Sequence, residues 1–393
     1  MAVIVQKYGG SSVADVQKIG LVADRVVAAK RAGHEVVVVV SAMGKTTDEL
    51  IGLARRAAEP SEPARRELDM LVSTGERVSM ALLSIAIHAR GHDAISFTGS
   101  QSGILTNDRH FDARIIEVRP HRIEDELARG RVVIVAGYQG MSYKREITTL
   151  GRGGSDTTAV ALAAALGAER CEIYSDVDGV YTADPRVVDE PQHLPVLDLA
   201  MLAEMAEAGA KVVNAQAVEW ARRSRITLVA RKTGDPIDGG RETVARGEEE
   251  LKNVRAIVGA KDVALIKLPA WSLTKIEAAL TKLDVACGDV LVAGDEAHVH
   301  IPLLNVPDWT RCERALDAAL EGKASFLGKH AIASVVGYGL TGASGALGKM
   351  IRMLISIDAP IHALFAGPLR ISATIPMDKL DAAQRALHGA FIE

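Results

Sequence analysis

Short, uninterrupted runs of valine and isoleucine recur along the first 230 residues and alternate with amphipathic stretches. The clearest run, Glu35–Val40, leads directly into the small and polar residues 41–44. Strands that are apolar throughout are covered on both faces, and the helices between parallel strands supply that cover. The pattern therefore predicts an α/β domain with a mostly parallel sheet, in which ligands gather at the carboxyl ends of the strands.

The expected elements of this domain follow from the same reading. Its strands are expected at Val3–Val5, Glu35–Val40, Ala94–Phe97, Val132–Ala136, Cys171–Tyr174 and Ile226–Val229. Its helices are expected to include Asp15–Ala32, Ser73–His88, Asp156–Leu166 and Ala200–Glu207. Gly, Pro and Asp cluster at residues 233–240, which predicts a first domain over residues 1–235 and a linker over 236–250.

Beyond residue 250 the pattern changes to strand, helix, strand, strand, helix, strand, and it occurs twice at low sequence similarity. This weak repeat predicts two βαββαβ modules within residues 251–393. Their approximate extents are 251–325 and 326–393, although their strands could be interleaved.

Composition excludes several classes of partner. The chain of 393 residues has 46 Lys and Arg against 50 Asp and Glu, a net charge of −4, which gives no reason to expect nucleic acid or an anionic membrane. No apolar run approaches the roughly 18 residues of a membrane span, and no basic-then-apolar leader is visible at the amino terminus. Three scattered cysteines support neither a disulfide framework nor a zinc site. A cytoplasmic protein is expected.

Residues 7–12 (KYGGSS) form the first candidate anion site. Lys7 ends a strand, two glycines follow, and two hydroxyl residues open a helix. Glycines let backbone N–H groups approach a ligand, and the helix amino terminus adds partial positive charge. A tight structural turn remains the alternative, and the spacing is not that of a Walker A loop.

A second glycine-rich loop, residues 148–158 (TTLGRGGSDTT), leads into an Ala-rich helix. Ser155 is a natural N-cap and Asp156 suits the first turn, so helix capping is the structural alternative for both. Capping does not explain Arg152, whose position between two glycines presents a guanidinium group to a carboxylate.

The third candidate, residues 174–186, has two acids directly after a strand. Its spacing is not that of an EF-hand, and a solvated turn is the alternative. Tyr181 and Arg186 add an aromatic surface and a cation that could bind phosphate, so the stretch favours a nucleotide over a bare metal.

Eight stretches together resemble aspartate kinases (aspartokinases) of the amino-acid kinase superfamily and span the whole first domain. They read KYGGSSV, VVVVSAMGKTTDEL, STGERVS, SFTGSQSGILT, VAGYQG, TTLGRGGSDTTAVALAAALGA, YSDVDGVYTADPRVV and GAKVVNAQAVEWA. The resemblance implies an amino-acid kinase fold, a mostly parallel sheet covered by helices on both faces, followed by two βαββαβ ACT-like modules. It also implies transfer of the ATP γ-phosphoryl group to the side-chain carboxylate of L-aspartate. Mg²⁺ is expected to bridge phosphate oxygens with few dedicated protein ligands, and no residue is assigned as a metal ligand.

Site residues carry over from the family position by position. The resemblance assigns catalysis to Lys7 and Asp156. It assigns substrate binding to Ser41, Thr47, Glu76, Arg152, Gly153, Gly154 and Ser155. It assigns nucleotide binding to Lys7, Tyr8, Gly9, Gly10, Ser175, Asp176, Tyr181, Asp184, Pro185, Arg186 and Lys211. Structural alternatives remain for three of these, with Thr47 as a helix N-cap, Glu76 as a solvated first-turn acid and Lys211 as a surface cation.

The ACT-like modules depart from the family pattern where effector amino acids dock. The usual Asp–Lys/Arg–Pro–Gly turn is replaced by residues 267–272 (KLPAWS), which lack the acid and the glycine and place Trp271 in the turn. The segment 285–290 is shortened, and residues 365–368 (FAGP) replace a polar run. Because a bound zwitterion needs paired polar partners, lysine and threonine are expected to inhibit weakly or not at all.

A homodimer through the ACT-like region is expected, since such modules pair side by side. Two other functions stay open at this point. One is a related amino-acid kinase that uses glutamate, acetylglutamate or a nucleotide. The other is a non-catalytic regulatory subunit, which would lose nothing when Lys7 is replaced by alanine.

Overall fold

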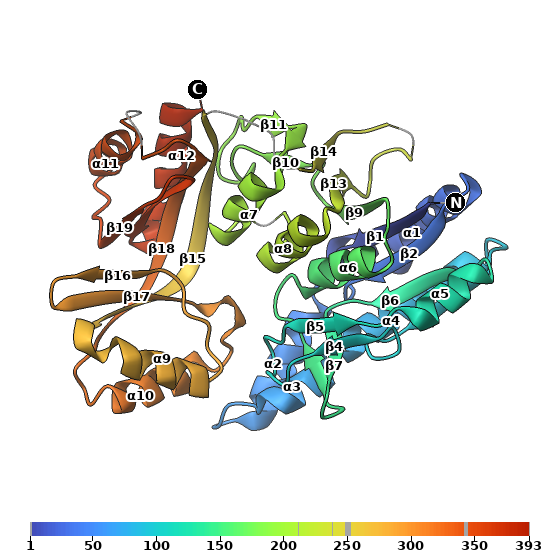
Figure 1. The fold of residues 1–393 in the computed structure, drawn as a ribbon, viewed down its shortest axis with the longest axis horizontal. Coiled ribbons are helices and arrows are strands. Elements are labelled where there is room, and N and C mark those ends of the chain that lie inside the picture. Colours follow the sequence, from blue (N-terminus) through green and yellow to red (C-terminus); the bar gives the residue numbers. More distant parts are fainter. Residues whose placement is uncertain (1, 211, 238, 248–252, 342–344, 393) are drawn as a thin grey trace. The chain divides into compact units, whose positions relative to one another are not determined.

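The structure is a computed structural model that describes residues 2–210, 212–237, 239–247, 253–341 and 345–392 (Figure 1). It divides into two compact units. The first comprises residues 1–180, 194–203 and 212–249, and the second comprises 181–193, 204–211 and 250–393. The second unit therefore takes two short segments from within residues 1–235, in addition to the carboxyl-terminal region.

An eight-stranded sheet forms the centre of the first unit, in the order β12-β14-β13-β9-β1-β2-β6-β3. Its strands are β1 (Val3–Tyr8), β2 (Glu35–Val40), β3 (Ala94–Phe97), β6 (Val132–Ala136), β9 (Arg170–Ser175), β12 (Val196–Leu197), β13 (Thr227–Lys232) and β14 (Glu242–Ala245). Every neighbouring pair is parallel except β13 and β14. The mostly parallel sheet predicted from the valine runs is confirmed.

Helices cover both faces of this sheet. The helices of this part of the chain are α1 (Val16–Arg31), α2 (Thr46–Ala58), α3 (Arg65–Val72), α4 (Thr74–His88), α5 (His121–Ala128), α6 (Gly154–Ala165), α7 (Leu199–Glu207) and α8 (Ala215–Ser224). Of these, α1 and α4 pack on one face of the sheet and α6 on the other, whereas α2 packs on α3, α3 packs on strand β8 (Ile147–Thr149) of a separate small sheet, and α7 is divided between the two units. Val36, Val38 and Val40 of β2 pack in one core cluster with α1 and α4. Strand side chains alternate between faces, and Val39 accordingly lies on the side of α6. By length and composition alone, residues 65–88 (α3 and α4) could cross a membrane, and 44% of their apolar 18-residue window is buried within the fold.

Two small sheets were not predicted from the sequence. One has the order β5-β4-β7-β8, and the other pairs β10 with β11. Their strands are β4 (Ile104–Thr106), β5 (Ile115–Val118), β7 (Gln139–Ser142), β8 (Ile147–Thr149), β10 (Val180–Tyr181) and β11 (His193–Leu194). These strands are two to four residues long, too short for a periodic pattern to be recognised.

The second unit is built on one six-stranded antiparallel sheet, in the order β16-β17-β15-β18-β20-β19. Its strands are β15 (Asn253–Pro269), β16 (Val290–Ala293), β17 (Glu296–Pro302), β18 (Ser325–Tyr338), β19 (Ala363–Ala366) and β20 (Arg370–Ile375). Its helices are α9 (Leu273–Lys282), α10 (Trp309–Ala319), α11 (Ala346–Ser356) and α12 (Leu380–Phe391). Each βαββαβ repeat expected from the sequence is present.

The two repeats share their longest strands. Residues 263–269 of β15 pair with β17, and their side chains pack with α9 and α10. The earlier half of the same strand pairs with the later half of β18, and Ile257 lies in the core of α11 and α12. The modules are therefore interleaved, because β15 supplies the first strand of one module and the last strand of the other.

Candidate functional site

An ion pair joins the first and second candidate loops. Lys7 lies near the carboxyl end of β1, and its Nζ atom is 2.7 Å from Oδ1 of Asp156 in the first turn of α6. Both side chains are mostly buried, at 12% and 9% exposure. An exposed ion pair adds little to stability, but a pair this desolvated holds both groups in one geometry.

Glu76 lies beside the end of β2. Its Oε1 atom accepts a hydrogen bond from Ala42 N at 3.0 Å, and the loop residue Ser41 donates its own N–H to Tyr8 O at 3.1 Å. Glu76 is 2% exposed, and burial raises the pKa of its carboxyl group to about 7. A solvated first-turn acid, the alternative left by the sequence, is therefore wrong for this residue.

The Gly-Arg-Gly loop makes a left-handed turn before α6. Gly151 and Gly153 have φ values of 73° and 76°, a region that favours glycine. Gly153, not Ser155, is the N-cap of the helix, so the N-cap predicted at Ser155 is wrong. Ser155 is the second helical residue and is buried. It packs against Gly137, where an added Cβ atom would lie 2.8 Å from the Ser155 hydroxyl oxygen.

The loop directs Arg152 towards α2. The Arg152 side chain is more than half exposed, and its guanidinium group donates to Oδ1 of Asp48 at 2.8 Å. Thr47 is the neighbouring residue of α2 and is half-buried. The N-cap of α2 is Lys45, so the capping role considered for Thr47 is wrong.

The glycines after β1 are tightly enclosed. A Cβ atom on Gly10 would lie 2.9 Å from Ala42 O, so only glycine fits between this loop and the end of β2. Gly9 N already donates to Tyr174 O at 3.1 Å. The ring of Tyr8 is fully buried and stacks on Tyr174 with centroids 4.7 Å apart, so any ligand contact of Tyr8 is restricted to its main chain.

The expected nucleotide residues divide between the two units. Ser175 ends β9, and Asp176 follows it as an exposed residue of the first unit. Tyr181, Asp184, Pro185 and Arg186 belong to the second unit, where Arg186 donates to both carboxylate oxygens of Asp184 at 2.9 Å. Lys211 lies outside the described residues.

Two residues that organise the site were missed. Asn214 caps α8 and donates from Nδ2 to Arg152 O at 2.9 Å, so it fixes the back of the Gly-Arg-Gly loop. Asp69 is fully buried and accepts hydrogen bonds from Thr149 at 2.5 Å and from Phe111 N at 3.1 Å. Burial raises the pKa of Asp69 to about 6. An Asn directly before a helical pattern was the available signal for Asn214, whereas nothing local distinguishes Asp69.

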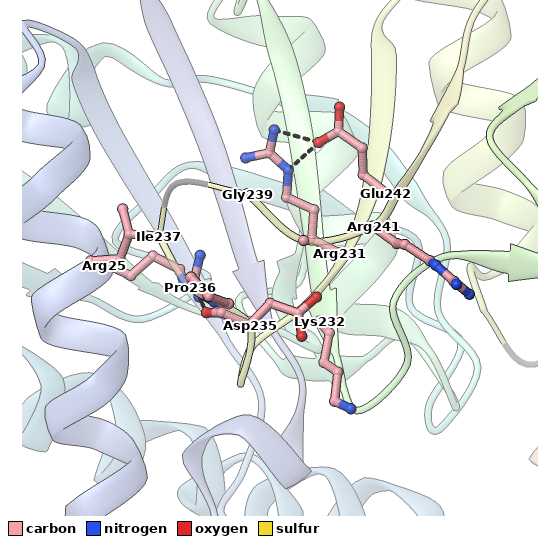
Figure 2. Close-up of a pocket in the computed structure, with 10 residues that line it drawn as sticks. Arg25, Arg231, Lys232, Asp235, Pro236, Ile237, Gly239, Arg241 and Glu242 are labelled. Atoms are coloured by element: carbon pink, nitrogen blue, oxygen red, sulfur yellow. Dashed lines mark hydrogen bonds and ion pairs between the residues drawn. The ribbon is translucent and has the colours of Figure 1, made fainter.

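A separate pocket of about 240 Å³ opens beside the β13–β14 connection (Figure 2). Arg231 pairs there with Glu242 at 2.6 Å, and Arg25 donates to Thr233 O at 3.1 Å. None of the residues expected to bind substrate or nucleotide lines this pocket. Its arginines at positions 25 and 231 are already bonded within the protein, which argues against a preformed anion site.

Among the described residues, no group of three or more His, Cys, Asp or Glu side chains is arranged to hold a metal ion. The acids nearest to the candidate loops are committed elsewhere or stand alone. Asp156 is paired with Lys7, and Asp176 is an exposed carboxylate directly after β9.

Comparison with known proteins decides the family. Residues 2–231 match the model of the amino acid kinase family. Aspartokinases from Corynebacterium glutamicum and Thermus thermophilus are 42% and 40% identical over 100% of this chain, which covers 96% and 99% of those proteins. The chain belongs to the aspartokinase family. The resemblance seen in the sequence is confirmed, and the chain is an aspartate kinase.

The architecture agrees with this family. The crystal structure of E. coli aspartokinase III in complex with aspartate and ADP has a TM-score of 0.89, and the match covers 100% of both chains. Its sequence identity of 24% is low, so this likeness speaks for the fold alone. The fold of an amino-acid kinase followed by ACT-type modules is confirmed.

Proposed function

We propose that the enzyme transfers the γ-phosphoryl group of ATP to the side-chain carboxylate of L-aspartate, giving 4-phospho-L-aspartate. The observation that carries the proposal is the buried Lys7–Asp156 pair at the carboxyl edge of the sheet, on the same edge as Glu76. The names of the relatives and the aspartate and ADP in the E. coli enzyme support these two substrates.

Two charged groups suit the two ends of the amino acid. The guanidinium group of Arg152 would bind the α-carboxylate, helped by amides of residues 153–155. Glu76 would bind the α-ammonium group, because its Oε2 atom is buried without a hydrogen-bond partner among the described residues. Ser41 and Thr47 would add hydrogen bonds at the ends of β2 and α2.

The reaction needs alignment and charge neutralisation more than proton transfer. The aspartate carboxylate is already ionised near neutral pH, so it can attack phosphorus without a general base. One carboxylate oxygen forms a bond to the γ-phosphorus, the bond to the β–γ bridging oxygen breaks, and that oxygen leaves with ADP. Lys7 would stabilise the negative charge on the transferring group, with Asp156 orienting its ammonium group.

On the nucleotide side, the residues proposed to bind ATP are the family-matched ones. They are Lys7, Tyr8, Gly9, Gly10, Ser175, Asp176, Tyr181, Asp184, Pro185, Arg186 and Lys211. Mg²⁺ would enter on the ATP phosphates and neutralise part of their charge, since few protein carboxylates are free to hold it.

The test is trapping of the acyl phosphate by hydroxylamine in the presence of Mg–ATP and L-aspartate. Wild type should form aspartyl hydroxamate, and Lys7→Ala should not. Lys144→Ala is the matched control, because Lys144 is an exposed lysine of the same unit whose ammonium group pairs with Asp108 and which is not among the proposed site residues. Hydroxamate formed equally by wild type and Lys7→Ala, or formed from glutamate in preference to aspartate, would contradict the proposal.

Weak or absent feedback by lysine and threonine is also proposed. Asp289, the one acid of the shortened segment 285–290, is paired with Arg370 at 3.1 Å. Trp271 lies in the turn before α9, with the ammonium groups of Lys275 and Lys323 at 5.6 and 5.2 Å from its ring centroid. The carboxylate of Asp289 and the ring of Trp271 are thus already engaged within the protein. Half-inhibition at submillimolar lysine, alone or with threonine, would contradict this.

We further propose that the enzyme is a homodimer that pairs through its ACT-like region. We also propose that it acts in the cytoplasm and catalyses the first step of the aspartate-family pathway. The edge strands β16 and β19 expose Val290, Val292 and Phe365, and unpaired edges of this kind are suited to strand pairing. Light scattering on wild type and Val292→Lys should show a dimer that the charged variant weakens.

A further inference from the structure

The segment 181–193 carries four of the proposed nucleotide residues, yet it belongs to the compact unit that contains the ACT-like modules. Thr182, a buried residue directly after Tyr181, makes the hydrogen bonds that attach this segment to the rest of its unit. The Thr182 carbonyl oxygen accepts from Ile257 N of β15 at 2.7 Å. Its hydroxyl group is 2.9 Å from Nε2 of His388, which is buried in α12 near the carboxyl end of the chain.

The Thr182 hydroxyl also closes the segment on itself. It accepts a hydrogen bond from Gln192 N at 2.9 Å, and Thr182 N donates to Gln192 O at the same distance. Arg385, one turn before His388 on α12, donates to Val187 O at 3.4 Å. Both ends and the middle of the segment are therefore bonded, directly or through Thr182, to elements of the regulatory modules.

This attachment holds the side chains that the segment presents. The Tyr181 ring meets His193 edge to face, with centroids 5.2 Å apart. Asp184 accepts from the N–H and the guanidinium group of Arg186, which fixes the arginine two residues further along. The bonds of Thr182 to His388 and to Ile257 thus restrain the position of Tyr181, and the closed segment carries that restraint on to Arg186.

We propose that Thr182 and His388 are positioning residues for ATP, because their bond holds the segment that presents Tyr181 and Arg186. The inference rests on the proposed nucleotide role of Tyr181 and Arg186. Removing the hydroxyl–imidazole bond leaves the Gly-Arg-Gly loop and Glu76 untouched, so aspartate binding is unaffected.

The experiment compares Thr182→Val with Thr374→Val. Thr374 is the matched control, because its buried hydroxyl lies 2.7 Å from Nε2 of His300 in the same unit and does not contact the segment. Thr182→Val should raise the KM for ATP and the Kd for Mg–ADP, measured by calorimetry, by about fivefold or more, because it removes the hydrogen bonds of the hydroxyl to His388 and to Gln192 N. The KM for aspartate should stay within twofold of wild type (roughly the spread of such measurements) in both variants.

Three further variants keep the test decisive if Thr182→Val folds poorly. Thr182→Ser keeps the hydroxyl and should restore wild-type nucleotide affinity, and His388→Gln keeps a polar atom near Nε2 and should lose less than His388→Leu. Equal nucleotide affinity in Thr182→Val and Thr374→Val would overturn the inference. The proposed function stands or falls separately, on whether wild type forms aspartyl hydroxamate, because the Mg–ADP titration needs no turnover.

Discussion

Ala42 N donates to Oε1 of Glu76 at 3.0 Å, while Oε2 of the same carboxylate is buried without a hydrogen-bond partner among the described residues. One backbone amide does not compensate for the lost solvation of a carboxylate, which is why burial raises the Glu76 pKa to about 7. A cation that arrives at Oε2 would supply the missing partner. Binding of a cation at Oε2 therefore requires the charged form of Glu76, and protonation of Glu76 opposes that binding.

The first prediction concerns the pH dependence of aspartate affinity. Below pH 7 Glu76 is protonated in the free enzyme, so the ammonium group of aspartate must displace a proton in order to bind. The KM for aspartate should rise about tenfold between pH 8 and pH 6, whereas the KM for ATP should not follow it. Glu76→Gln should bind aspartate weakly at both pH values, and a flat wild-type profile would contradict the assignment.

The second prediction concerns stability, for which the same pKa has the opposite consequence. The folded-state pKa of Glu76 lies above its ordinary value of 4.5, so protonation of this carboxyl group stabilises the folded state. This contribution to the free energy of unfolding is fully present below pH 4.5 and is lost as the pH rises through about 7. Glu76→Gln removes the titration. Its free energy of unfolding should exceed that of wild type by up to about 3 kcal/mol at pH 8 and match it near pH 4, as measured by urea denaturation.

The third prediction separates Arg152 from its partner in α2. Asp48 occupies the guanidinium group in the structure and would compete with the carboxylate of a bound amino acid. Asp48→Asn should therefore leave the KM for aspartate equal to wild type or lower it by up to about fivefold, the usual worth of an exposed pair. Arg152→Lys loses the planar fork and should raise this KM about tenfold or more. Equal effects of the two substitutions would argue against a direct role of Arg152.

The sequence was informative where physical signals are local. The continuous valines of β2 located a buried strand to the residue, and two glycines around Arg152 located a loop. The structure shows that both glycines of this loop are left-handed, at φ values of 73° and 76°. The N-cap of α6 was predicted at Ser155 but lies at Gly153. N-cap preferences favour serine, whereas the left-handed backbone at this N-cap favours glycine.

Signals that depend on distant partners could not be found in this way. Asp69 resembles any acid of an amphipathic helix until Thr149 and Phe111 are brought to it by the fold. The attachment of Thr182 to His388 joins residues 206 positions apart. The sequence left open whether the two modules are interleaved, because this depends on the full length of β15. The pairing register of β15 shifts near Asp262, and the hydrophobic pattern does not show that one strand continues through this shift.

The fourth prediction tests the support behind Arg152. A Cβ atom on Gly153 would lie 2.8 Å from Nδ2 of Asn214, the atom that donates to Arg152 O. Gly153→Ala should therefore combine strain at φ 76° with displacement of Asn214, and the loosened loop should raise the KM for aspartate about tenfold. Steady-state kinetics with aspartate as the varied substrate measure this effect.

Gly167 supplies the control for that substitution. It also has a positive φ, 58°, but a Cβ atom there would meet nothing within 4 Å. Gly167→Ala should lower the free energy of unfolding by about 1 kcal/mol through strain alone and leave the KM for aspartate unchanged. If Gly153→Ala and Gly167→Ala change both quantities equally, the contact with Asn214 has no role in substrate binding. A rise in KM confined to Gly153→Ala, reproduced in part by Asn214→Ala, shows that Asn214 holds Arg152 in place for the substrate.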